Sequence, residues 1–188
     1  MNIYAKSICK ERVKMLKQCF DNVREKHPLV HNITNYVTVN DVANILLACG
    51  GSPIMADDSG EVEDITSICQ GLNINIGTLN KNTIPSMFLA GKKANVLGHV
   101  VLLDPVGAGA SGLRTKTANE LVRDIKFTVI RGNISEIRTL MEGTGNTKGV
   151  DADLADAVTE ENLDETIGKL KAFSEATGSV IAVTGAID

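Results

Sequence analysis

The sequence lacks the features that mark several large classes of protein. Its 188 residues contain no apolar run as long as a membrane span, and residues 1–26 are charged throughout, without the apolar centre of a secretory signal. The 19 Lys and Arg residues, against 23 Asp and Glu, form no basic cluster. We therefore expect a cytoplasmic protein that has neither a membrane nor a nucleic acid as its partner.

Several chemical motifs are absent as well. The four cysteines form no Cys-x-x-Cys pair, so the sequence gives little support to a zinc site or a disulfide. It contains no Gly-x-x-x-x-Gly-Lys-Ser/Thr segment and no Gly-x-Gly-x-x-Gly segment, which excludes the two commonest nucleotide-binding loops. Ser111 and the histidines do not show the spacing of a familiar hydrolytic triad.

The composition itself is that of an ordinary globular protein. Apolar residues make up 43% and charged residues 22%, with a net charge of −4, which fits a single domain over residues 1–188. Apolar segments typical of strands occur at 29–31, 52–55, 73–76, 99–104, 127–130 and 180–183. Helical patterns occur up to residue 26 and at 38–49, 61–70, 80–97, 115–124, 135–141 and about 160–177. This alternation predicts an α/β fold, with a mainly parallel sheet and helices on both faces.

The first helix is expected to be amphipathic and to end before Pro28, because a residue that precedes proline avoids the helical region. Its apolar face would carry Cys9, Val13, Leu16, Phe20 and Val23, which recur at steps of three and four. Thr34 is a candidate cap for the second helix.

Polar or glycine-rich segments lie where the predicted strands end. They occupy residues 31–35, 51–55, 104–109, 131–136 and 184–188. The carboxyl edge of an open α/β sheet is where such folds bind ligands. The sequence thus predicts a ligand site assembled from several strand ends.

The segment at 104–109 follows the most hydrophobic strand. Asp104 could hold Mg²⁺ through water, because this ion prefers a few carboxylates and retained waters. Gly107 and Gly109 would let backbone N–H groups approach an anion. An Asp-Pro turn with flexible glycines explains the same residues equally well.

The segment at 131–136 brings together a guanidinium, an amide and a carboxylate. Asn133 and Glu136 are three residues apart at a helix start, so both can point into one cleft beside Arg131. Such groups suit a metal–phosphate complex. Considered alone, the pair is better explained as a capping box, with Asn as the cap and Glu as its partner.

The remaining segments are less specific. The polar residues at 31–35, among them Asn35, could satisfy the free N–H groups of a helix or bind a small polar heterocycle. Met55 could pack on such a ring or fill the core. Thr184 precedes a glycine and could contact a nucleotide phosphate, although a Thr-Gly pair is usually a turn.

Taken in order, the segments at 28–37, 51–55, 104–109 and 131–136 resemble those of the hydroxyethylthiazole kinase family. The resemblance runs from about Pro28 to the last residue. It implies a three-layer ribokinase-like fold and transfer of the ATP γ-phosphoryl group to the primary alcohol of 4-methyl-5-(2-hydroxyethyl)thiazole, in thiamine biosynthesis and salvage. It also implies Mg²⁺, ATP as co-substrate, and a homotrimer with the thiazole near a subunit boundary.

The resemblance carries residue roles with it. Met55 and Asn35 would contact the thiazole, and Arg131 and Thr184 would contact ATP. Asp104 and Glu136 would organise Mg²⁺ and its waters, with Asn133 in support. Positioning and charge neutralisation of this kind supply most of the catalysis in phosphoryl transfer.

Family members continue beyond the Thr-Gly-x-x-Asp stretch that lies at 184–188. They add further strands and a Gly-x-Gly-Cys or Gly-x-Gly-Asp loop, which forms an anion hole and places the residue that activates the alcohol. We therefore expect a fold that is incomplete at its C-terminus, no catalytic base within 1–188, and a last strand that is an exposed edge.

Three alternatives to an active thiazole kinase follow. One is a chain that binds thiazole, or joins full-length subunits, without turnover. Another is a related kinase for a pyrimidine or pyridoxal alcohol. The third is ATP-dependent repair of hydrated nicotinamide cofactors.

Overall fold

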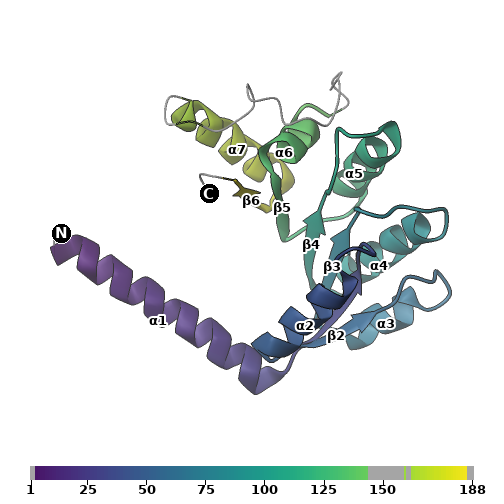
Figure 1. Ribbon diagram of the computed structural model, residues 1–188, viewed down its shortest axis with the longest axis horizontal. Helices are drawn as coiled ribbons and strands as arrows, with labels where there is room; N and C mark the ends of the chain where they lie inside the picture. Colours follow the sequence, from purple (N-terminus) through teal and green to yellow (C-terminus); the bar gives the residue numbers. More distant parts are fainter. Residues whose placement is uncertain (1–2, 144–158, 160–161, 186–188) are drawn as a thin grey trace.

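The structure is a computed structural model that describes residues 3–143, 159 and 162–185, with side chains from Val13 onward. Its strands are β1 (Leu29–Ile33), β2 (Ser52–Met55), β3 (Gly71–Asn75), β4 (Val100–Asp104), β5 (Val129–Asn133) and β6 (Val180–Thr184). Its helices are α1 (Ile3–Lys26), α2 (Val39–Cys49), α3 (Val62–Ile68), α4 (Thr83–Leu97), α5 (Gly112–Asp124), α6 (Ile134–Met141) and α7 (Leu163–Thr177). Figure 1 shows these elements in one view.

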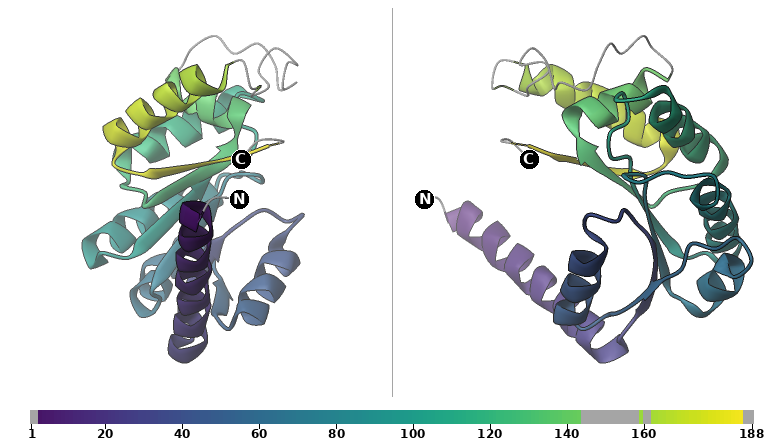
Figure 2. Two further views of the ribbon diagram at one scale, coloured as in Figure 1. Left: turned by 90° about the vertical axis from the view of Figure 1, so that its left-hand side faces the viewer. Right: turned by 45° about the vertical axis from the view of Figure 1, so that its right-hand side comes forward.

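The strands form one six-stranded parallel sheet in the order β2-β1-β3-β4-β5-β6. The connection from β1 to β2 runs one way across the sheet, and all later connections run the other way. Because such crossovers are right-handed, α2 lies on one face and α3, α4 and α5 lie on the other, as Figure 2 shows. The predicted parallel sheet with helices on both faces is confirmed, and the fold is ribokinase-like.

The core lies between the sheet and the helices that follow β2 onward. Side chains alternate along each strand, so Ile74, Leu103 and Ile130 are buried, and they belong to a cluster that includes residues of α4, α5 and α6. On the opposite face of the same strands, Asn73, Leu102 and Val129 are half-buried. The packed face holds the carboxyl ends of the central strands in fixed register.

Helix α1 extends away from the sheet (Figure 1). It ends at Lys26, as predicted, and His27 Nδ1 lies 3.1 Å from the carbonyl oxygen of Gly50, at the end of α2. The predicted apolar stripe forms, but Val13, Leu16 and Phe20 are 61%, 56% and 49% exposed. Within the described residues, this stripe is not covered.

The prediction that Thr34 caps the second helix is wrong. Helix α2 begins only at Val39, and the N–H groups of Val37 and Thr38 donate to the side-chain oxygen of Asn35, at 3.0 and 3.1 Å. An asparagine side chain accepts readily from the backbone two or three residues ahead. The prediction missed the short turn between β1 and α2 that this hydrogen bonding creates.

Other element boundaries differ by a few residues. Helix α5 begins at Gly112 rather than at residue 115, because the side chain of Ser111 accepts a hydrogen bond from Arg114 N, at 3.3 Å. Helix α3 is shorter than predicted, and β1 extends to Ile33. The segment between the helices predicted at 135–141 and about 160–177 lies largely outside the described residues. No helix in the described part of the chain is both long and apolar enough to cross a membrane.

Candidate functional site at the carboxyl edge of the sheet

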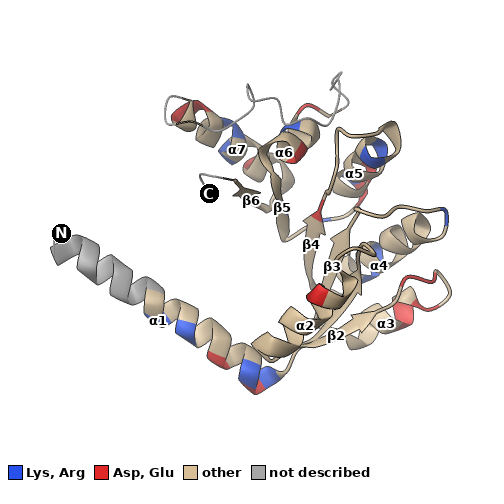
Figure 3. Ribbon diagram, viewed as in Figure 1, with Lys and Arg blue, Asp and Glu red and all other residues tan. Residues whose placement is uncertain are grey.

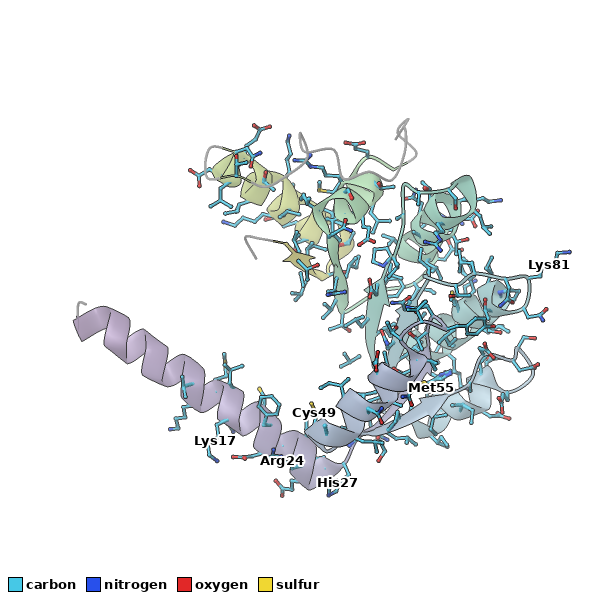
Figure 4. All side chains as sticks on the ribbon, viewed as in Figure 1. Lys17, Arg24, His27, Cys49, Met55 and Lys81 are labelled. Carbon is cyan, nitrogen blue, oxygen red and sulfur yellow. The ribbon has the colours of Figure 1, made fainter. Side chains whose placement is uncertain are left out.

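The candidate residues line up along the carboxyl edge of the sheet. Met55 ends β2, Asp104 ends β4 and Thr184 ends β6. The strand of Met55 lies three positions from that of Asp104, about 14 Å across the sheet at ordinary strand spacing, and the strand of Thr184 lies two positions beyond, about 10 Å across the sheet. Figure 4 labels Met55 among the side chains of this region. One edge therefore carries all the sequence-predicted residues, in a fixed order.

The edge has a switch point between β1 and β3. The chain leaves these neighbouring strands toward opposite faces of the sheet, and the carboxyl ends of strands at such a point are where open α/β sheets have their ligand crevice. Asn35, after β1, donates from Nδ2 to Oδ1 of Asn75, the last residue of β3, at 3.0 Å. Both amides are buried. The crevice is thus bridged by a hydrogen bond between two asparagines.

Asp104 continues this row on the next strand. Its Oδ2 accepts a hydrogen bond from Asn75 Nδ2, at 2.9 Å, and an ion pair from Arg131 Nη1 of β5, at 3.3 Å. Its Oδ1 is buried and has no hydrogen-bond partner within the described residues. A buried acceptor without a partner is costly, so this oxygen is the natural contact for a group that is brought by a ligand.

Burial raises the pKa of Asp104 above its ordinary value, and the nearby carboxylate of Glu136 adds to this. Arg131 and the hydrogen bonds to Oδ2 oppose the shift of the Asp104 pKa. Arg131 is about half exposed, so solvent weakens its compensation. Figure 3 shows the acidic colour at the tip of β4. The site therefore holds a poorly compensated carboxylate.

Asn133 and Glu136 form the capping box that was the alternative prediction for this pair. The side chain of Asn133 accepts from Glu136 N, at 2.9 Å, and Glu136 Oε2 accepts from Asn133 N, at 2.8 Å. Glu136 Oε1 accepts a further hydrogen bond from Gly107 N, at 2.8 Å. Each carboxylate oxygen keeps a second lone pair. The metal role of both residues stays a prediction, now beside a demonstrated structural one.

Four N–H groups of the glycine loop after β4 already have hydrogen-bond partners. Gly107 donates to Glu136, and Gly109 donates to Thr115 Oγ1, at 2.9 Å. Ala108 and Ala110 donate to carbonyl groups within the loop, both at 2.9 Å. Gly107 and Gly109 have φ of +72° and +94°, which favours glycine. These contacts favour the turn interpretation of residues 104–109 over an anion-binding cradle of N–H groups.

Arg114 joins two loops of this edge. Its Nη2 donates to the carbonyl oxygen of Gly77, after β3, at 2.8 Å. Its guanidinium also lies where a side chain on Gly107 would stand. The loops that follow β3 and β4 are therefore fastened to each other beside Asp104.

His31 supports the Met55 end of the site from beneath. It is fully buried, with Nε2 at 2.8 Å from the carbonyl oxygen of Ala56 and Nδ1 at 2.9 Å from Thr66 Oγ1. A carbonyl only accepts, so Nε2 carries the proton and Nδ1 accepts from Thr66 in the neutral form. Burial lowers the pKa of His31. Met55 itself is 37% exposed, which favours the contact interpretation over the core one.

Sequence reasoning missed Asn75 and Arg114. The signal for Asn75 was present, because Asn and Ile alternate over residues 73–76 and place the asparagines on one face of the strand. What the sequence did not give was strand order, which sets β3 between β1 and β4. Arg114 lies inside α5, and only the tertiary fold brings it to Gly77. Thr184 pairs in register with Asn133 on β5, as a residue of this edge should. Among the described residues, no group of three or more His, Cys, Asp or Glu is arranged to hold a metal.

The fold and the site together define a class. A ribokinase-like parallel sheet with a switch point, and with a carboxylate and an arginine at its carboxyl edge, defines an open α/β protein whose ligand site is expected at that edge.

Comparison with known proteins gives the family. A sequence model of the hydroxyethylthiazole kinase family matches residues 20–188, and the chain belongs to this family. It is 68% identical to a hydroxyethylthiazole kinase of Clostridium acetobutylicum and 57% identical to one of Clostridium tetani, over 93% and 88% of its own length. The solved structure of a hydroxyethylthiazole kinase from Pyrococcus horikoshii OT3 is 36% identical, covers 92% of this chain and has a TM-score of 0.79.

The chain spans only part of each relative. It covers 64% and 60% of the two clostridial proteins and 61% of the archaeal chain.

Proposed function

We propose that this protein phosphorylates the primary alcohol of 4-methyl-5-(2-hydroxyethyl)thiazole with ATP, in thiamine biosynthesis and salvage. The observation that carries the proposal is the order of side chains along the sheet edge. Met55 and Asn35 belong to the β2–β1 end, Arg131 and Thr184 belong to the β5–β6 end, and Asp104 lies between. Phosphoryl transfer needs this order, because the transferred group must lie between the alcohol and the nucleotide.

Asp104 is the residue that best fits Mg²⁺. Its buried Oδ1, which has no partner among the described residues, is a hard oxygen donor at the centre of the edge, and Mg²⁺ is usually held by one or two carboxylates together with waters and substrate phosphates. When bound, the ion would neutralise charge on the phosphate groups. Glu136 and Asn133 would act through water, because their hydrogen bonds already bind the backbone.

The chain's own residues would divide the remaining work. Arg131, about half exposed and paired with Asp104, would turn part of its guanidinium to phosphate oxygens, for which its planar donors are suited. Thr184 would add a hydroxyl at the nucleotide end. Met55 would pack against the thiazole ring with its flexible thioether, while the bridge from Asn35 to Asn75 closes the floor of the crevice.

The proposal is tested with the purified chain, Mg-ATP and the thiazole alcohol. Mass spectrometry measures the phosphorylated alcohol, and calorimetry measures binding of the thiazole. Product that disappears in Asp104→Asn and Arg131→Ala, but not in Arg123→Ala, would support it. Arg123 is a suitable control because it is exposed and paired with Asp124, on α5 away from the edge.

Other outcomes separate the alternatives. Binding of thiazole without product would identify a non-catalytic thiazole-binding subunit. Faster phosphorylation of a pyrimidine or pyridoxal alcohol would show that the substrate is different from the one proposed. Loss of hydrated NADH would show that the reaction is different. If the chain neither binds thiazole nor forms product, the proposal is overturned for this chain.

We further propose a cytoplasmic homotrimer, on the family resemblance. Its support is the exposure of apolar residues beside the site, since Tyr36 and Val37 are 66% and 87% exposed directly after Asn35. Exposed apolar groups that cluster at a ligand site are typical of interfaces. The cytoplasm is proposed because it is where the cell holds the ATP that a kinase consumes. Light scattering of the purified chain would measure its mass, and a monomer at all concentrations would contradict the trimer.

A further inference from the structure

Asn75 lies at the centre of the edge, and its side-chain amide makes three hydrogen bonds. Its Oδ1 accepts from Asn35 Nδ2, at 3.0 Å, and from Gly77 N, at 2.9 Å. Its Nδ2 donates to Asp104 Oδ2, at 2.9 Å. Asn75 is 6% exposed, so little water reaches it. The side chain connects the turn after β1, the turn after β3 and the last residue of β4.

The orientation of this amide is fixed by its neighbours. A backbone N–H such as that of Gly77 can only donate, so the atom that faces it must be the side-chain oxygen. An ionised carboxylate can only accept, so the atom that faces Asp104 must be the NH₂ group. Turning the amide over would oppose like groups on both sides.

Space around the amide is also restricted. A side chain on Gly77 would stand 3.0 Å from both Asn75 Oδ1 and Asn35 Cβ. The absence of a side chain at residue 77 lets this turn close over the two asparagines. Arg114 then holds the carbonyl group of the same glycine from α5.

We infer that Asn75 is a positioning residue that holds Asp104 Oδ2, so that Oδ1 is the oxygen presented to the ligand, and that ties this carboxylate to Asn35. With Oδ2 also held by Arg131, the carboxylate cannot exchange its two oxygens by rotation without breaking both contacts. The β2–β1 end of the site and the central carboxylate are thereby joined through one amide. The functional half of this inference rests on the proposed kinase activity, because it takes Asp104 as the contact for Mg-nucleotide.

Asn73 supplies a matched control. It lies two residues earlier on β3, on the same face, and its Nδ2 donates to Asn32 Oδ1, at 3.2 Å. It is half-buried and pairs in register with Leu102 rather than with Asp104. Asn73→Ala therefore removes an amide from the same strand without touching the proposed contact.

The first experiment is a double-mutant cycle with Asn75→Ala and Asp104→Ala, read by urea unfolding of the whole chain. If Asn75 forms a hydrogen bond to the charged carboxylate of Asp104, the two substitutions are not independent. The double variant should then shift the unfolding equilibrium by at least roughly tenfold less than the product of the shifts of the two single variants. In the control cycle, which combines Asn73→Ala with Asp104→Ala, the shift of the double variant should equal the product of the two single shifts. A multiplicative result for Asn75 would overturn the inference.

The second experiment measures binding of a non-hydrolysable ATP analogue with Mg²⁺, by calorimetry. We expect Asn75→Ala to weaken the affinity about tenfold, the loss of one charge-assisted contact, and Asn73→Ala to change it less than twofold. In the Asp104→Ala background, Asn75→Ala should have no further effect, whereas an equal further loss would contradict action through Asp104. A wild-type chain that binds neither nucleotide nor thiazole would overturn the proposed function, and the unfolding cycle would still decide whether Asn75 holds Asp104.

Discussion

At the scale of single residues, the site is built around one carboxylate that the fold leaves partly unsatisfied. Asp104 has one oxygen held by Asn75 and Arg131 and the other buried without a partner in the described residues. Asp104 could be singled out from the sequence, because it follows a strongly apolar strand. Its partner Asn75 could not, because a contact between residues 75 and 104 depends on which strands are neighbours.

The raised pKa of Asp104 predicts that its charge destabilises the fold. The folded chain binds this proton more tightly than the unfolded chain does, so stability is lost as pH rises above the ordinary Asp pKa of about 3.9. We expect Asp104→Asn to raise the melting temperature at pH 7 and to weaken Mg-nucleotide binding. The exposed Asp124, paired with Arg123, is the control, and Asp124→Asn should give no gain. A lower melting temperature for Asp104→Asn would contradict the prediction.

His31 predicts a second dependence on pH, of opposite sign. Burial lowers its pKa, so below about pH 6.5 the unfolded chain takes up a proton that the folded chain resists. The wild-type chain should lose stability as pH falls from 7.5 to 5. His31→Gln should be less stable than wild type at pH 7.5, and this difference should shrink toward pH 5. Urea unfolding at several pH values measures both, and a constant difference would show that His31 does not titrate in this way.

At the scale of elements, strand ends and helix starts were the most readable part of the sequence. Helix α6 and its capping box lie where the spacing of Asn133 and Glu136 predicted them. Helix α2 was placed correctly at its C-terminal end, where Gly50 has φ of +96°, but not at its start. A glycine after a helix leaves few alternatives, whereas several polar residues at 34–38 could each act as a cap. Local chemistry therefore predicts an end better when only one residue can provide it.

The capping box predicts the effect of a single substitution. Asn133→Ala removes the side chain that accepts from Glu136 N, which should cost about 1 kcal/mol of unfolding free energy. Asn82 precedes α4 in the same way but makes no side-chain cap, so Asn82→Ala should cost less than about 0.5 kcal/mol. Urea unfolding measures both. Equal losses would mean that the cap does not stabilise α6.

The glycine loop predicts a local effect of substitution in addition to a global one. Gly107 and Gly98 have nearly equal φ, +72° and +71°, but only a side chain on Gly107 would meet Arg114, since nothing lies within 4 Å at Gly98. Both alanine variants should lose about 1 kcal/mol from backbone strain. Because the end of the Arg114 side chain can move aside, Gly107→Ala should also break the hydrogen bond from Arg114 to the carbonyl group of Gly77. Amide hydrogen exchange over 76–82 should then become faster in Gly107→Ala and stay unchanged in Gly98→Ala.

At the scale of the whole molecule, sequence alone predicted the parallel sheet but not the strand order. The alternation of elements excludes most other architectures, whereas nothing in residues 29–33 states that β1 lies between β2 and β3. The apolar stripe of α1 shows the same limit. Its period was predicted correctly, but a period states that one face is apolar and not which surface, if any, will cover it. Contacts between distant segments are decided by the whole fold.

The order of strands predicts that the two ends of the site can be disturbed separately. The strands that carry Met55 and Thr184 lie five positions apart, about 24 Å across the sheet. We expect Met55→Ala to weaken thiazole binding about tenfold and to leave nucleotide binding unchanged, and Thr184→Val to do the reverse. Calorimetry with each ligand alone measures this. Loss of both affinities in either variant would mean that the site is not arranged along the edge as proposed.

The contact between the capping box and the glycine loop has a consequence for how this sequence can evolve. Glu136 accepts from the N–H groups of both Gly107 and Asn133, and a side chain on Gly132 would stand 3.0 Å from its carboxylate. The effect of a mutation at any one of these positions therefore depends on which residues occupy the others. Residues 107, 132, 133 and 136 should therefore tolerate joint changes better than single ones. Among the variants that random mutagenesis and selection recover, changes at these positions should occur in compensating combinations far more often than singly.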